Sequence, residues 1–188
     1  MSSRKYVQYD ALTACNAYSF YSLGGMRNTD LVLCEFGILS SMRYLEDLTV
    51  GERILTRPAK ITEAEILTFA RQFDPQPMHV DREAAHNGPL GGLSASGWHT
   101  AAIVMRLIVD ADPLEGVPWL GLGVDELRWP NPVRPGDTIT VEIEVVSVTP
   151  SRSKPSHGIV RTGITARNQK DEVVMTLFPN LWIPRRPL

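Results

Sequence analysis

The chain has 188 residues, 21% of them charged and 43% hydrophobic, with a formal net charge of -2. This length suits one domain with a sizeable core, and the near-neutral charge gives no electrostatic reason to expect a nucleic-acid partner. The sequence shows neither an apolar run of membrane-spanning length nor a secretory leader pattern, so we expect a cytoplasmic protein that does not enter a membrane.

Residues 1–41 differ in character from the rest of the chain. Ser, Tyr, Asn and Gly are scattered there without a period, and both cysteines, Cys15 and Cys34, fall in this stretch. Met42 begins a segment that is typical of the start of a domain. We therefore predict an N-terminal extension of uncertain structure over 1–41 and a single domain over 42–188, which folds without disulfides and has no thiolate metal ligands.

A helix with a clear beginning and end is predicted after a short strand at 52–56. Thr62 and Glu65 have the spacing of a capping box, in which the two residues satisfy each other's backbone amides. The apolar side chains that follow recur at i, i+3, i+4 and i+7 and define one buried face: Ile66, Phe69, Ala70 and Phe73. The Asp74-Pro75 step should end this helix and leave Asp74 against the core.

The remaining elements predict the fold class. Asp81 should cap a short helix that ends at Gly88, and a small-residue loop then leads to a long helix at 98–110. That helix is apolar around nearly its whole circumference and should be buried on most sides. Strands are predicted at 120–129, 139–145, 159–167 and 173–178, the last two forming a hairpin. Together they indicate an α+β domain whose antiparallel sheet curls round the long helix.

The segment Asp74-Pro75-Gln76-Pro77-Met78-His79 carries the clearest chemical signal. It sets a carboxylate and an imidazole five positions apart, with two prolines stiffening the loop, so both groups can be aimed at one small volume. Asp and His near their ordinary pKa values are a competent pair for proton transfer at neutral pH. The alternative is structural, because Asp-Pro commonly opens a turn and a single His in a loop is often exposed or satisfied.

These residues resemble the MaoC-like dehydratases, including the (R)-specific enoyl-CoA hydratases, which have the hotdog fold of a curved antiparallel sheet wrapped around a long central helix. The family signature is Asp-x-Asn-Pro-x-His, an Asp two residues later, and a Gly-rich turn ending in a His-Gly that opens the central helix. Asp74, Pro77, His79 and Asp81 match, and Gly97 lies where the helix-opening glycine is expected. The resemblance covers about residues 44–183.

Two positions in this motif depart from the family pattern. Gln76 stands where Asn is usual, and Ser96 stands where His precedes the helix-opening glycine. We take both as candidate substrate-binding residues. Further along the helix, Met105 occupies the position at which some hydratases carry a supporting Ser.

The resemblance implies a hydro-lyase that adds water to an enoyl-CoA thioester to give an (R)-3-hydroxyacyl-CoA, with no cofactor and no metal. Asp74 and His79 would hold one water, and Asp74 would take its proton as oxygen adds to the β-carbon. Gly97 would point its amide at the thioester carbonyl from a helix N-terminus, where unpaired N–H groups favour developing negative charge. A glycine there would let the substrate approach the backbone closely.

An acyl-CoA substrate also requires partners for its phosphates. Arg152 and Lys154 are our candidates, although a solvated loop is the commoner explanation for such a segment. A single curved sheet leaves long edges, so we further expect a homodimer or an assembly of dimers. Two other function classes stay open: an acyl-CoA thioesterase of the same fold, and a non-catalytic module that binds acyl thioesters.

Overall fold

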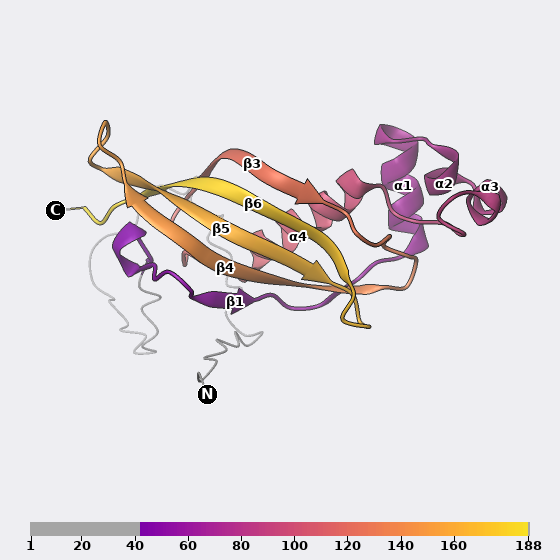
Figure 1. The fold of residues 1–188 in the computed structure, drawn as a ribbon, viewed down its shortest axis with the longest axis horizontal. Coiled ribbons are helices and arrows are strands. Elements are labelled where there is room, and N and C mark those ends of the chain that lie inside the picture. Colours follow the sequence, from indigo (N-terminus) through magenta and orange to yellow (C-terminus); the bar gives the residue numbers. More distant parts are fainter. Residues whose placement is uncertain (1–41, 188) are drawn as a thin grey trace, which may run out of the picture.

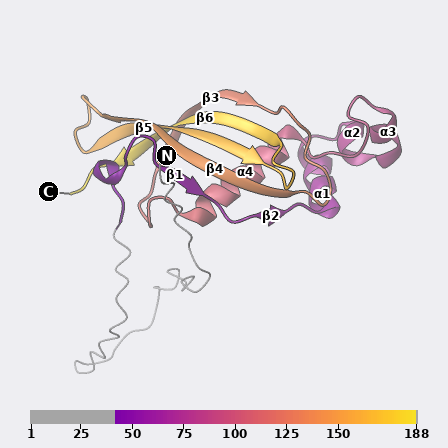
Figure 2. The same cartoon turned by 60° about the horizontal axis from the view of Figure 1, so that its bottom comes forward.

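An antiparallel sheet and one long helix dominate the residues that this computed structural model describes, which are 42–187. The predicted extension over 1–41, with both cysteines, lies outside the described residues. Helix α4 (Gly97–Ala111) lies along one face of the sheet, and three shorter helices gather beyond one end of it (Figure 1, Figure 2). None of the helices in 42–187 is long and apolar enough to cross a bilayer.

Within residues 42–187 the sheet has six strands. Its order is β1-β4-β5-β6-β3, and β2 pairs with β4 beside β1. The strands are β1 (Arg53–Leu55), β2 (Ala59–Lys60), β3 (Leu120–Arg128), β4 (Thr138–Pro150), β5 (His157–Arg167) and β6 (Val173–Pro184). The remaining helices are a 3₁₀ turn at Leu45–Asp47, α1 (Glu63–Phe73), α2 (Pro77–Val80) and α3 (Arg82–Asn87). This arrangement confirms the α+β hotdog fold predicted from the sequence.

Two strands run further than their sequence pattern predicted. β4 continues past Val145 to Pro150, and β6 continues to Pro184. A bulge between Val145 and Ser147 shifts the register of β4 against β5, and Pro179 interrupts the pattern of β6. Pairing with β5 nevertheless continues beyond both irregularities, because the neighbouring strand supplies partners that the sequence of one strand does not reveal.

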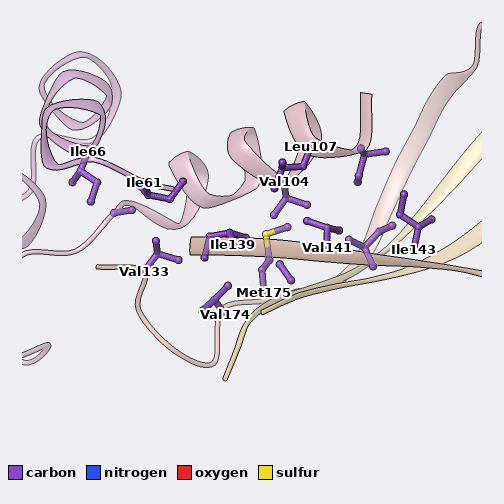
Figure 3. Close-up of a cluster of buried hydrophobic side chains, with 14 of the residues drawn as sticks. Ile61, Ile66, Val104, Leu107, Val133, Ile139, Val141, Ile143, Val174 and Met175 are labelled. Atoms are coloured by element: carbon purple, nitrogen blue, oxygen red, sulfur yellow. The ribbon is translucent and has the colours of Figure 1, made fainter. Parts of the chain in front are cut away.

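The core lies between α4 and the sheet. Inward-facing side chains alternate along β4 and β5, and Val104 and Leu107 of α4 point towards Ile139 and Val141 of β4 (Figure 3). Met175 of β6 fills the space between them and is fully buried. The α+β packing therefore buries one face of α4 against one face of the sheet.

The expectation that α4 is buried on most sides is wrong for the single chain. Trp98 is 63% exposed, Met105 48% and Val109 54%, although all three are apolar residues on the central helix. The sheet covers one side of a helix and leaves the opposite side open. These three side chains on α4 are therefore only partly covered by residues 42–187.

Candidate active site

Local capping delivers Asp74 and His79 to the same place. Both halves of the predicted capping box form between Thr62 and Glu65, so α1 begins at Glu63 and ends at Phe73. Asp74 is the C-terminal cap, and its N–H donates to the carbonyl of Ala70 at 2.9 Å. The next residues form the single turn α2, which was not predicted because one turn is too short to show a period.

The two candidate proton-transfer groups face each other at short range. Oδ2 of Asp74 lies 3.6 Å from Nε2 of His79, which is slightly too long for a hydrogen bond. The His79 side chain is 8% exposed and that of Asp74 is 19% exposed, so the pair is shielded but reachable. The structure thus brings together the two residues that the motif predicted.

A backbone carbonyl determines which nitrogen of His79 carries the proton. Nδ1 of His79 lies 2.8 Å from the carbonyl oxygen of Ser94, which can only accept a hydrogen bond. Nδ1 is therefore the protonated nitrogen, and in the neutral ring Nε2 presents a lone pair towards Asp74. A neutral Nε2 and a carboxylate are both acceptors, and only a group with two hydrogens can donate to both at once.

Two side chains hold the carboxylate of Asp74. The hydroxyl of Ser96 donates to Oδ2 at 2.6 Å, and the amide of Gln76 donates to Oδ1 at 2.7 Å. The bond from Ser96 and then the bond from Gln76 lower the pKa of Asp74 from its usual value, and burial opposes them. Asp74 is therefore ionised at neutral pH.

Ser96 links this carboxylate to the start of the central helix. Its side chain is buried, and its oxygen accepts a hydrogen bond from the N–H of Trp98 as the N-cap of α4. The single O–H of Ser96 goes to Asp74. Ser96 was predicted to bind substrate, but within this chain its one donor already serves Asp74.

Gly97 begins α4, and the structure gives a different reason for a glycine there. A Cβ at this position would lie 2.8 Å from Cε2 of Trp129, so the indole ring needs the space that we had expected a substrate to need. Trp129 also meets Trp98 edge to face, with ring centroids 5.5 Å apart. As the first helical residue, Gly97 still has an N–H that no carbonyl of its own helix can accept.

Arg152 and Lys154 do not join this cluster. They lie in the loop between β4 and β5, at the end of the sheet opposite to α1, α2 and α3 (Figure 1). β4 has 13 residues between the two ends, or about 40 Å at ~3.3 Å per residue. Within one chain Arg152 and Lys154 therefore lie far from Asp74, and their role as phosphate partners stays a prediction.

Sequence reasoning missed three contributors to the site. They are the carbonyl of Ser94, the indole of Trp129 and the side chain of Arg134, which binds the loop before α4. Each acts across 15 or more positions of sequence, where no periodic signal exists. Asp81, by contrast, caps α3 as predicted by accepting from the N–H groups of Glu83 and Ala84.

Comparison with known proteins gives a consistent result. A family model described as MaoC like domain matches residues 47–168. The crystal structure of a MaoC-like dehydratase from Rhodospirillum rubrum is 46% identical with a TM-score of 0.72, over 77% of this chain and 99% of that one. Protein YdeM of Bacillus subtilis is 32% identical over 68% of this chain and 89% of its own length. A 3-hydroxybutyryl-CoA dehydratase of Methylorubrum extorquens is 29% identical over 59% of this chain and 69% of its own length.

Proposed function

Because the chain belongs to the MaoC-like domain family, whose named relatives include dehydratases, we propose that it reversibly adds water to an enoyl-CoA thioester to give an (R)-3-hydroxyacyl-CoA. One observation carries the proposal: Oδ2 of Asp74 and Nε2 of His79 lie 3.6 Å apart as two acceptors facing one volume. A water molecule is the simplest group that can donate a hydrogen to each of them.

The proposed reaction uses this water as the nucleophile. With its two hydrogens directed at Asp74 and His79, the water has its lone pairs free for the β-carbon of the enoyl group. Asp74 accepts a proton as the carbon–oxygen bond forms, and the electrons of the double bond move towards the thioester carbonyl. The proton then passes to the α-carbon on the same face, so one water is added in total. Dehydration follows the same steps in reverse.

Gly97 is proposed to stabilise the negative charge that develops on the thioester oxygen. Its N–H is at the N-terminal end of a helix of 15 residues, where the helix dipole favours negative charge. Ser96 is the residue before it and already contacts Asp74. The proposed proton acceptor, Asp74, is therefore hydrogen-bonded to the residue that directly precedes the proposed oxyanion donor, Gly97.

The acyl chain is proposed to occupy an apolar cavity between α4 and the sheet. Its wall on the helix begins at Ala101, about one turn from Gly97, and continues through Val104, Met105 and Ile108. None of the lining residues within 42–187 is charged. Burying a carboxylate in such surroundings would be costly, so the site should prefer uncharged acyl chains over dicarboxylic ones.

A single assay tests the proposal. The protein is incubated with crotonyl-CoA while the enone absorbance and the release of free thiol are followed together. Loss of the enone without free thiol, with formation of (R)-3-hydroxybutyryl-CoA, is the expected result. Thiol release would instead identify a thioesterase. No change in either signal, with binding detected by calorimetry, would identify a non-catalytic acyl-binding module.

A further inference from the structure

Arg134, in the segment between β3 and β4, binds the loop between α3 and α4. Nη1 of Arg134 donates to the carbonyl of Gly92 at 2.5 Å and to that of Leu93 at 3.2 Å. Nη2 of Arg134 donates to the carbonyl of Leu90. Three backbone carbonyls of this loop are therefore bound by a single guanidinium that is more than 40 positions away in sequence.

This loop is a segment that needs external support. It contains two glycines with positive φ, Gly91 at 64° and Gly92 at 156°, and glycine retains the most conformational freedom in an unrestrained chain. No helix or strand includes residues 88–96. Its later part is fixed by backbone bonds from Ser94 to Met78 and from Ala95 to Val133. Its earlier part is held by Arg134.

The same loop carries both groups that orient the proposed catalytic pair. The carbonyl of Ser94 accepts from Nδ1 of His79, and the hydroxyl of Ser96 donates to Asp74. Leu93, the last residue that Arg134 holds, directly precedes Ser94. A shift of the loop would therefore change the orientation of His79 and the hydrogen bonding of Asp74 together.

Arg134 is itself anchored. Its backbone N–H donates to Oδ2 of Asp137 at 2.7 Å, and Gln169 donates to the other oxygen of this buried carboxylate at 2.7 Å. Within residues 42–187 its guanidinium makes no ion pair, so its donors are directed to carbonyls. A planar fork of five N–H groups can reach several carbonyls at once, whereas the ammonium of lysine is a single point.

We propose that Arg134 is a positioning residue, which fixes His79 and Asp74 through the loop at 90–96. The positioning stands on the contacts above, and its effect on catalysis rests on the proposed hydration. The consequence is that a change at Arg134 should alter the ionisation of Asp74, which Arg134 does not touch. An arginine that only added stability would leave that ionisation as it is in the wild-type chain.

The test is an NMR titration of the Asp74 carboxyl in the full chain, assigned by comparison with Asp74→Asn. Four proteins are compared: wild type, Arg134→Gln, Ser96→Ala and the double variant. Arg106→Gln is the matched control, because Arg106 is exposed on α4 and pairs with Asp110 away from the loop. Ser96→Ala removes the main cause of the lowered pKa of Asp74, so its pKa should rise.

Arg134→Gln should raise the same pKa, and the double variant should raise it no further than Ser96→Ala alone, because both changes act through one hydrogen bond. Turnover should fall about tenfold to a hundredfold with little change in KM, since positioning rather than binding is lost. The expected result in Arg106→Gln is wild-type behaviour. If Arg134→Gln does not fold, the same titration is carried out on Arg134→Lys. This variant keeps the positive charge but loses the planar guanidinium.

An unchanged Asp74 titration in a folded Arg134 variant, or shifts that simply add in the double variant, would overturn the proposal. The titration does not depend on any substrate. If the protein hydrates no thioester while the pKa still moves as described, the hydratase proposal fails and the positioning proposal stands.

Discussion

The N-terminal end of helix α4 and its outer face differ in how far other residues of the same chain satisfy or cover their side chains. At its N-terminal end both side chains of the proposed catalytic pair have partners: Asp74 has Ser96 and Gln76, and His79 has the carbonyl of Ser94. Along its outer face, apolar side chains are exposed instead. The side chains of the proposed catalytic pair are therefore positioned by contacts within one chain, whereas the apolar surface on the outer face of α4 is left exposed.

The exposed apolar surface extends from α4 to the edge strand β3. It consists of Trp98, Met105 and Val109 on the helix and Leu120, Leu122 and Val124 on the strand. Among the described strands, β3 is at one end of the order and pairs with β6 alone. An open edge beside an apolar helix face suits self-association, so we propose that a second copy covers this surface.

The largest effect on turnover is expected from a change at Asp74, near the N-terminal end of α4. Asp74→Asn keeps the shape of the side chain but cannot accept a proton, so turnover with crotonyl-CoA should fall about a hundredfold or more. The variant should fold normally, as judged by circular dichroism. Gln76→Ala is a suitable companion, because it removes a contact to Asp74 without removing the base. Near wild-type turnover in a folded Asp74→Asn protein would show that the loop is structural.

A change on the apolar side should affect assembly first. Val109→Glu combined with Leu122→Glu places charges on the exposed apolar surface of α4 and β3, and these charges would repel or be desolvated against a second copy. The dimer should weaken at least about tenfold, measured by light scattering over a dilution series. Lys170→Glu, on the turn between β5 and β6, is the control and should leave the dimer unchanged. A wild-type chain that is monomeric at micromolar concentration would refute the proposed dimer.

A smaller effect is expected in the pH profile of the site. The hydrogen bond from Gln76 contributes to the lowered pKa of Asp74, so Gln76→Leu should raise that pKa. Activity that requires ionised Asp74 is lost below this pKa, and the acid limb of kcat/KM should therefore move to higher pH. Gln76→Glu offers a contrast, because a second carboxylate should raise the pKa further. An acid limb that stays in place in both variants would mean that it reports another group.

The smallest effect concerns the apolar cavity. The hydroxyl of Thr162 lines it, is buried and has no hydrogen-bond partner within the described chain. Thr162→Val keeps the shape and removes an unsatisfied polar group, so the free energy of unfolding should rise by about 1 kcal/mol. Denaturant unfolding measures this, with exposed Thr149→Val as the control. Destabilisation by Thr162→Val would show that the hydroxyl has a partner in solution.

The contacts that were predicted from the sequence join residues that lie close together along the chain. The capping box joins Thr62 to Glu65, and Asp81 caps the helix that starts at the next residue. In each case the donor and the acceptor lie within a few positions, so the residue type and the spacing together determine the contact. The meeting of Asp74 and His79 was also predictable, because the prolines restrict the short segment between them.

The contacts that were missed depend on the folded chain as a whole. Ser96 lies 22 positions from Asp74, and Arg134 lies more than 40 from the carbonyls that it binds. The wrong prediction about the burial of α4 has a related cause: the sequence gives the polarity of each side chain but not which side of the helix the sheet covers. Trp129 against Gly97 is a further case, since nothing near Gly97 in sequence indicates the ring.

The most direct test of the account is a double-mutant comparison at the proposed water. Hydration of crotonyl-CoA is measured for Asp74→Asn, His79→Ala and the two combined, each with folding verified. If both side chains act on one water, the double variant should be little slower than the slower single variant, because the second change removes a partner that has already lost its function. Losses in turnover that multiply would contradict a shared water, and two single variants with near wild-type turnover would contradict the proposed function itself.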